Sequence, residues 1–341
     1  MSKQLNIGVI GLTHDHIWDN LPWLAHAKGA RLVAAAEPND TLRRRVAREY
    51  GCAVHADFKT MLKRETLDAV LIYGDNRGGA VAGVEALRRG LHVLIEKPMA
   101  ADLAGADALL RAAHRAQRRL MINWPIAWWP ALQHALAMAR DGKIGHVWQT
   151  RYRAAHNGPR EMGASRFFCD WLYDPQRNGG GALIDYCCYG AALARVVLGR
   201  PHSVLAVAGR LCKRDLATED NAVLLMRYPN ALAIAEASWT QVDKMTAYFT
   251  VIYGEQGTLL VEPGERGRLL HATPEHPGGR PVRVPRVPEH QRHAVAHFVW
   301  ALQTGDGFHP LCSAEAGRDA QAILSAGARS AKSGREIKLP S

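Results

Sequence analysis

The chain has 341 residues, 48% of them hydrophobic and 22% charged, which is the composition of a soluble globular protein and more chain than one ordinary core accommodates. No uninterrupted apolar stretch approaches the roughly 20 residues that span a bilayer, and the first residues run into a strand without a signal peptide, so we expect a cytoplasmic protein with no membrane partner. The formal charge of +11 comes from arginines dispersed along helices, so we expect no nucleic-acid partner.

The first part of the chain alternates apolar strands with helices. Strands are expected at Leu5–Ile10, Leu32–Ala36, Ala69–Tyr73, Leu91–Ile95 and Leu120–Asn123. Helices are expected between them, with ends at Gly29, Gly51 and Gly90, and a further one over Asp102–Gln117. The helix that ends at Gly51 has the clearest start, because Asn39 and Asp40 are both good N-caps. This βαβ rhythm predicts an α/β fold with a doubly wound parallel sheet.

After Trp124 the pattern changes to strand-like runs whose residues alternate in character. These runs are His146–Arg153, Ser203–Gly209, Ala222–Tyr228, Ala231–Trp239 and Ala247–Tyr253. Such alternation is typical of a sheet with one covered face, so the second half is expected to be α+β with a mostly antiparallel open sheet. Helices are expected over 182–198, Ala294–Leu302 and Ala314–Ser330, and a loop or irregular edge over Pro274–Pro288.

The turn after the first strand is where a dinucleotide-binding fold holds the pyrophosphate, and here it reads Gly8-Val9-Ile10-Gly11-Leu12-Thr13-His14-Asp15-His16. Only Gly11 matches G-x-G-x-x-G, because Thr13 and His16 occupy the other two glycine positions. Thr13 still offers a hydroxyl and an amide, and His14 or His16 is placed to cap a diphosphate. A turn that binds no ligand remains the alternative.

Glu37 closes the second strand, where an acid bonds the adenosine ribose hydroxyls and disfavours a 2′-phosphate. This favours NAD, although the arginines at 43–45 keep NADP open. His14, His16 and His26 also suggest a metal cluster, but no carboxylate or thiolate completes it in the sequence, and the six scattered cysteines lack metal-ligand spacing. We therefore expect no metal and no disulfide framework.

A lysine lies at the end of the most informative apolar run, His92-Val93-Leu94-Ile95-Glu96-Lys97-Pro98. Residues Val93–Ile95 predict a buried strand, and the carboxyl ends of parallel strands are where ligands bind in open α/β sheets. Partial desolvation also makes the pKa of such a lysine tunable. The alternative is an ordinary strand end with a solvated turn.

These features resemble the glucose–fructose oxidoreductase / inositol dehydrogenase / rhizopine catabolism (Gfo/Idh/MocA) family over essentially the whole chain. The motifs that carry the resemblance are Leu67–Ile72 with Asn76, Gly90–Pro98, Asp141–Gly145, Gly179–Asp185 and Ala328–Gly334 with Leu339 and Pro340. The resemblance implies an NAD(P)-dependent oxidoreductase that acts on a sugar, polyol or related compound. It also implies a homodimer or homotetramer built through the second-domain sheet.

Together, the residues and the resemblance give the expected domains and site. The domains are a dinucleotide-binding Rossmann domain at 1–123 and an α+β substrate and oligomerisation domain at 124–341, with C-terminal helices packing back on one of the two. Cofactor contacts are expected from Gly8, Gly11, Leu12, Thr13, His14, Glu37, Asn76, Glu96 and Lys97. Substrate contacts are expected from Lys97, Asn123, Trp124, His156, Asp185 and Tyr189. For His156 an unremarkable turn is an equal alternative, and for Trp124 the alternative is packing between the domains.

The chain departs from the family where a catalytic histidine is customary. The segment after the glycine run reads Asp185-Tyr186-Cys187-Cys188-Tyr189, so a tyrosine stands in that place, as in glucose–fructose oxidoreductase and some other members. Asp185 and Tyr189 are four residues apart and share one face of the expected helix. We hypothesise that Tyr189 transfers the hydroxyl proton while Lys97 polarises the substrate oxygen and lowers the tyrosine's pKa. Asp185 would orient Lys97 or the substrate.

Plainer roles and other functions stay open at this point. Asp185 suits the N-terminal turn of a helix, and Tyr189 suits a core. The eroded glycine turn favours a non-catalytic regulator that senses NAD(P) or a sugar. A glycosidase that uses NAD transiently is a further alternative.

Overall fold

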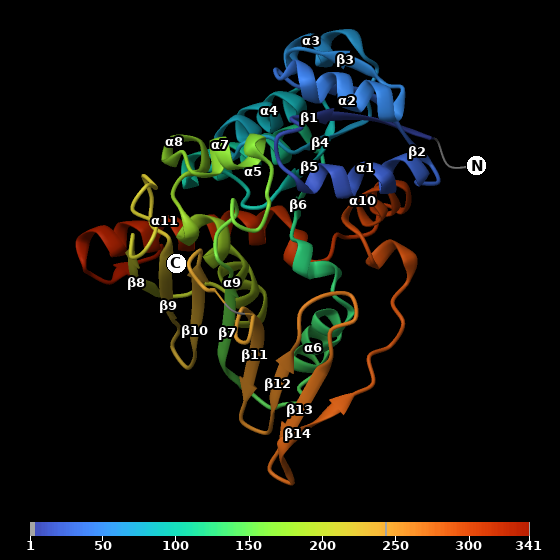
Figure 1. The fold of residues 1–341 in the computed structure, drawn as a ribbon. Coiled ribbons are helices and arrows are strands. Elements are labelled where there is room, and N and C mark those ends of the chain that lie inside the picture. The colour runs from blue at the N-terminus through green and yellow to red at the C-terminus, as the bar shows by residue number, and fades with distance from the viewer. Residues whose placement is uncertain (1–3, 243, 341) are drawn as a thin grey trace.

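The computed structural model describes residues 4–242 and 244–340, and a six-stranded parallel sheet organises its first part (Figure 1). Its strands are β1 (Leu5–Ile10), β2 (Ala30–Ala36), β3 (Ala53–His55), β4 (Ala69–Ile72), β5 (His92–Glu96) and β6 (Leu120–Asn123). They lie in the order β3-β2-β1-β4-β5-β6, and every neighbouring pair is parallel. The doubly wound parallel sheet is therefore confirmed, with its switch point between β1 and β4.

Helices connect these strands, namely α1 (His16–His26), α2 (Asp40–Tyr50), α3 (Phe58–Arg64), α4 (Asn76–Arg88) and α5 (Leu103–Ala116). Local chemistry sets the bounds of α2: the Asn39 side chain accepts the Leu42 amide proton at 3.2 Å, and Gly51 ends the helix with φ 65°. The sequence did not predict β3 or α3. Strand β3 has only three residues and lies at the sheet edge with Ala53 and Val54 exposed, so it lacks the apolar run that marks a buried strand.

The second sheet has nine strands in the order β14-β13-β12-β11-β7-β10-β9-β8-β15. They are β7 (Val147–Ala155), β8 (Ser203–Gly209), β9 (Asn221–Arg227), β10 (Leu232–Ser238), β11 (Tyr248–Gly254), β12 (Thr258–Val261), β13 (Leu269–Thr273), β14 (His276–Val282) and β15 (Ile337–Lys338). Only β7 and β10 pair in parallel, so the expected mostly antiparallel sheet is confirmed. The stretch expected as a loop or irregular edge contains the edge strand β14.

Helices cover one face of this sheet (Figure 1). The helical elements after β6, not all of which lie on this face, are η1 (Pro125–Trp128), α6 (Pro130–Arg140), α7 (Arg166–Leu172), α8 (Pro175–Asn178), α9 (Ala182–Leu198), η2 (Glu289–Gln291), α10 (Ala294–Thr304), η3 (Pro310–Cys312) and α11 (Ala314–Ser333). Helix α9 has the predicted bounds and packs on β7, β9 and β10, and α11 packs on β8. In addition, α11 contacts α5 and α10 contacts α1, so both C-terminal helices touch the half that holds the parallel sheet.

The opposite face of the nine-stranded sheet is open and apolar in part. Its exposed residues on β8, β9 and β10 are Leu205, Val207, Val223, Leu225 and Leu232. Cross-strand pairing places Leu205 opposite Leu225 and Val207 opposite Val223, so these side chains form one patch, called here the open-face patch.

One helical stretch of the described residues, Pro175–Leu198, is long and apolar enough to cross a membrane. The criterion is met by length and composition alone, and 72% of its apolar window is buried inside the protein. This is how a core helix behaves, and the stretch ends in α9, the helix that covers the second sheet.

Candidate functional site

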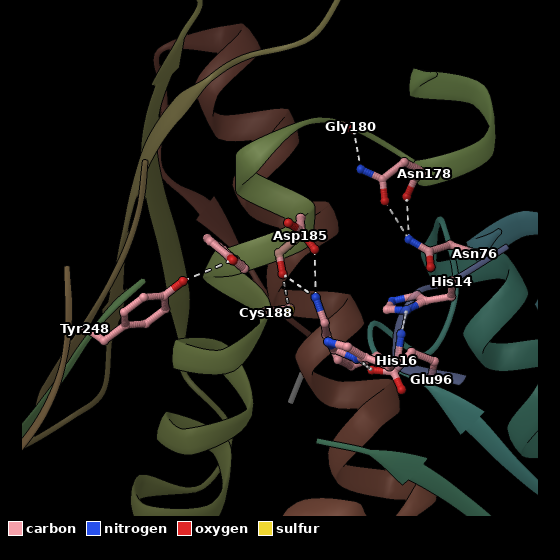
Figure 2. Close-up of polar contacts among 11 residues, drawn as sticks. His14, His16, Asn76, Glu96, Asn178, Gly180, Asp185, Cys188 and Tyr248 are labelled. Carbon is pink, nitrogen blue, oxygen red and sulfur yellow. Dashed lines mark hydrogen bonds and ion pairs between the residues drawn. The ribbon is translucent and has the colours of Figure 1, made fainter. Parts of the chain in front are cut away.

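The structure joins Lys97 and Asp185 in a buried ion pair between the two sheets. Lys97 follows β5. Asp185, which Figure 2 labels, lies in the first turn of α9. The lysine Nζ donates to Asp185 Oδ1 at 2.7 Å and to the Asp185 carbonyl at 3.1 Å. Burial alone would lower the pKa of Lys97, but the Asp185 carboxylate, with Cys188 and Glu96, more than offsets it and raises that pKa. Lys97 is therefore a cation at neutral pH.

Tyr189 lies one helical turn beyond Asp185, with its ring against the lysine. The Lys97 Nζ is 4.9 Å from the ring centroid, and the rings of Tyr152 and Trp124 pack on the same tyrosine with centroids 5.7 and 5.8 Å away. Burial raises the pKa of the Tyr189 phenol well above its usual value, and Cys188 and Tyr152 act in the same direction. This is opposite to the lowering by Lys97 that the sequence led us to expect. The phenol is a proton donor at neutral pH.

His156 and a pair of tyrosines complete the second-sheet side of the site. The His156 Nδ1 accepts the Gly158 amide proton at 2.8 Å, and burial lowers the pKa of this histidine to about 4 against the raising effect of Asp185. A neutral imidazole whose Nδ1 accepts carries its proton on Nε2, so His156 is a donor at that atom. Tyr186 packs against His156 at 4.9 Å, and its hydroxyl lies 3.2 Å from the Tyr248 hydroxyl. Neither tyrosine was identified from the sequence.

Glu96 links the site to β6 and to the turn before α1. Its Oε2 accepts from Asn123 Nδ2 at 2.7 Å, and Asn123 Oδ1 accepts from the Trp128 indole at 3.1 Å. The other oxygen, Oε1, lies 3.1 Å from His16 Nδ1. Asn123 therefore positions Glu96. Trp124 is buried and packs edge-on against Tyr189.

The contact between Glu96 and His16 places a carboxylate beside His14 and His16, and the sequence did not reveal this. His14, His16 and Glu96 each offer one ligand atom, and these atoms lie within 4.8 Å of one another. The His14 Nδ1 already accepts the His16 amide proton at 3.2 Å, and the charge of nearby Lys97 helps burial and His16 to lower the pKa of His14. The positive charge of Lys97 disfavours a cation at this position. His26 bonds to the Pro22 carbonyl instead.

A cavity of about 630 Å³ lies at the carboxyl ends of β1, β2 and β4. Gly11, Thr13, Glu37 and Asp75 line it. Gly11 has φ +81°, and a Cβ there would lie 2.5 Å from the Gly74 backbone nitrogen, so only glycine fits this close approach. The Glu37 carboxylate accepts the Leu12 amide at 2.7 Å and the Asn39 amide at 2.8 Å, which fixes an acid at the cavity wall.

This donor set fits the adenosine and diphosphate end of NAD. An acid at the end of β2 suits a ribose with free hydroxyls, and a glycine-floored groove at the β1 turn suits a diphosphate. The cavity is also large enough for a ligand of that class.

Other expected cofactor residues lie away from the residues that line this cavity. Gly8 lies within β1 and faces Leu67, and the Leu12 side chain is buried. The His14 ring packs against Phe168 of α7 with centroids 4.6 Å apart. Asn76 donates to the side chain and the carbonyl of Asn178, which joins the two halves of the chain (Figure 2).

Comparison with known proteins identifies the family of the chain. Residues 5–124 match the oxidoreductase family with an NAD-binding Rossmann fold, and residues 132–260 match the GFO/IDH/MocA C-terminal domain. The chain is 23% identical to 2,7-anhydro-N-acetylneuraminate hydratase of Mediterraneibacter gnavus, over 92% of this chain and 91% of that one. It is 24% identical to D-apiose dehydrogenase of Paraburkholderia graminis, over 99% and 89%.

Solved structures agree on the fold. Levoglucosan dehydrogenase in complex with NADH and levoglucosan matches with a TM-score of 0.83 and 21% identity, over 99% of this chain and 100% of that chain. The WlbA dehydrogenase from Bordetella pertussis, in complex with NADH and UDP-GlcNAcA, matches with a TM-score of 0.83 and 20% identity, over 99% and 98%. The first family match covers the six-stranded sheet, and the second covers β7 to β11 and most of β12 of the nine-stranded sheet. The chain belongs to the GFO/IDH/MocA family of NAD-binding oxidoreductases.

Proposed function

We propose that the protein transfers a hydride between NAD and a hydroxyl or carbonyl carbon of a sugar, polyol or related compound. The observation that carries this proposal is the buried Lys97–Asp185 pair beside Tyr189, at the carboxyl end of β5. Relatives named for D-apiose, levoglucosan and a UDP-sugar support the substrate class. When bound, NAD supplies the hydride chemistry.

In this proposal the three site residues have separate roles. An ammonium has three donors, and Lys97 uses two of them on Asp185, so one remains for the substrate oxygen. The cation polarises that oxygen and stabilises negative charge on it. Tyr189 is protonated at neutral pH, so it donates its proton to the oxygen in carbonyl reduction. Asp185 holds the ammonium in place.

In this scheme the surrounding residues bind the substrate and the cofactor. His156 offers its Nε2 proton to a substrate hydroxyl, and Glu37 accepts from the adenosine ribose. The acid favours NAD over NADP, because a 2′-phosphate beside it would be repelled. We also propose that the boundary between a cofactor domain and a substrate and oligomerisation domain lies near residues 123 and 124, where β6 ends, and that the protein is cytoplasmic.

The first experiment identifies any nucleotide that copurifies with the protein, and then follows NADH absorbance with aldoses, polyols and glycosides. We expect bound NAD and turnover with at least one carbohydrate. A non-catalytic sensor is the second candidate, because Lys97, Asp185 and Tyr189 are all buried in this structure. Tight NAD binding without turnover, in either direction and over a broad panel, would support the sensor and contradict the enzyme.

We further propose that two chains pair through the open-face patch. Exposed apolar side chains on neighbouring strands are costly in water and suit a homodimer or homotetramer interface. Charges at Val207 and Leu225 (Val207→Lys with Leu225→Lys) should therefore lower the mass measured by light scattering to that of one chain. Val242→Lys, at an exposed residue outside the patch, is the control and should leave the mass unchanged. A wild-type protein that is already monomeric would contradict the proposal.

A further inference from the structure

Three consecutive residues at the start of α4 each hold one residue of the short helix α8. Arg177 contacts Asp75 Oδ2 from Nη2 at 3.0 Å and from Nε at 3.3 Å. Asn76 Nδ2 donates to Asn178 Oδ1 at 2.7 Å, and Arg77 Nε donates to the Gln176 carbonyl at 2.6 Å. This set of contacts, called here the α4–α8 clasp, brings an arginine from the half with the nine-stranded sheet to the cofactor cavity.

Four backbone amides in and just after the turn that follows β1 are already engaged within the protein. The amides of Gly11, Leu12 and His14 donate to the Ala36 carbonyl, the Glu37 carboxylate and the Tyr73 carbonyl, and the His16 amide donates to His14. These are groups that a phosphate would otherwise use at a helix N-terminus.

An acidic residue also stands at the start of α1. Asp15 is the N-cap residue there, and its carboxylate accepts the Ser165 amide proton at 2.7 Å. This side chain makes no capping hydrogen bond to α1, and its negative charge disfavours a second anion near the start of the helix. With Thr13 in place of a glycine as well, a positive charge from outside this turn would strengthen the binding of a diphosphate.

Arg177 is the residue placed to supply that charge. It lines the same cavity as Gly11 and Thr13, and its side chain is 43% exposed. Its present partner, Asp75, does two things at once: Oδ1 caps α4 by accepting the Gly78 amide at 2.7 Å, and Oδ2 holds the guanidinium. Arg177 can therefore leave Asp75 while the α4 cap stays intact.

We infer that Arg177 is the diphosphate-binding cation of the NAD site, and that Asp75 holds its guanidinium ready until the dinucleotide enters. This rests on the proposed NAD-dependent function. A guanidinium presents a planar fork of donors that matches two phosphate oxygens, which a flexible ammonium would not do as specifically. The diphosphate carries more negative charge than the Asp75 carboxylate, so it replaces Asp75 as the partner of Arg177. Binding at one half of the chain thereby engages a residue from the other.

The test is equilibrium binding by titration calorimetry, with NAD, ADP-ribose and adenosine as probes. Arg177→Gln should raise the dissociation constants of NAD and ADP-ribose about tenfold or more, because a charge-assisted contact is lost. Adenosine lacks the diphosphate, so its affinity should not change. Asp75→Asn keeps the α4 cap but removes the competing charge, and it should leave ADP-ribose affinity unchanged or increase it.

Arg77→Gln is the matched control, because Arg77 also joins α4 to α8 but lines a different cavity. If loss of the α4–α8 clasp were the cause, this variant would weaken ADP-ribose binding as much as Arg177→Gln does, and the role of Arg177 would be overturned. Unchanged ADP-ribose binding by Arg177→Gln would overturn it too, while the NAD-dependent function would stand. A wild-type protein that binds neither NAD nor ADP-ribose would overturn the function itself.

Discussion

Lys97→Met is expected to lower kcat by about a thousandfold, because it removes the cation proposed to polarise the reacting oxygen in a buried site. The proposed role uses the third ammonium proton, since Asp185 takes the other two. Methionine keeps the length of the side chain and loses both the charge and the donors. The measurement is steady-state turnover of the best carbohydrate substrate, together with the dissociation constant for ADP-ribose. That constant should stay nearly unchanged, because Lys97 lies apart from the residues that line the cofactor cavity.

A loss of folding must be separated from a loss of chemistry in this variant. Lys97 and Asp185 have side chains only 3% and 6% exposed, so removal of the lysine leaves an unpaired buried carboxylate, at a cost of about 3–5 kcal/mol in unfolding free energy. Lys97→Met with Asp185→Leu removes both charges, and urea unfolding should show recovered stability. Turnover should not recover with it. A stable double variant with wild-type turnover would contradict the role of Lys97.

The sequence predicted the elements whose signals are local. Helix α2 begins after a capping asparagine and ends at a glycine in the left-handed conformation. Helix α9 lies between two glycines, and its apolar face marks the helical residues between them. Lys97 was found for the same reason, since a charged residue after a buried apolar run is visible in a few letters of sequence. The doubly wound parallel sheet followed from the βαβ rhythm of the sequence, whereas the order of its strands came from the structure.

Contacts across long separations could not be predicted in this way. Asn76 and Asn178 are 102 residues apart, and Tyr186 and Tyr248 are 62 apart, with no local pattern that pairs them. Glu96 was visible, but its approach to His16 depends on how α1 leaves the sheet.

The burial of the site residues likewise depends on the whole fold. The sequence places a lysine and a tyrosine in one site, but it does not show that desolvation outweighs the charge of the lysine at Tyr189. The direction of that pKa shift decides whether Tyr189 begins as an acid or as a base. Experiment can therefore distinguish a Tyr189 that begins protonated from one that begins ionised.

Tyr189→Phe should lower kcat at least tenfold, by removing the proton donor without changing the ring that packs on Tyr152 and Trp124. The pH dependence tests the direction of the pKa shift. A raised pKa keeps the phenol protonated through neutral and mildly alkaline pH, so wild-type carbonyl reduction should hold a plateau there and fall only above about pH 10. If Lys97 instead lowered the pKa of Tyr189, reduction would begin to fall near neutral pH while alcohol oxidation rose. In Tyr189→Phe the rate of carbonyl reduction should no longer depend on the ionisation of residue 189. If reduction by this variant still falls with rising pH as in the wild type, the titrating group is another residue, and Tyr189 does not transfer the proton.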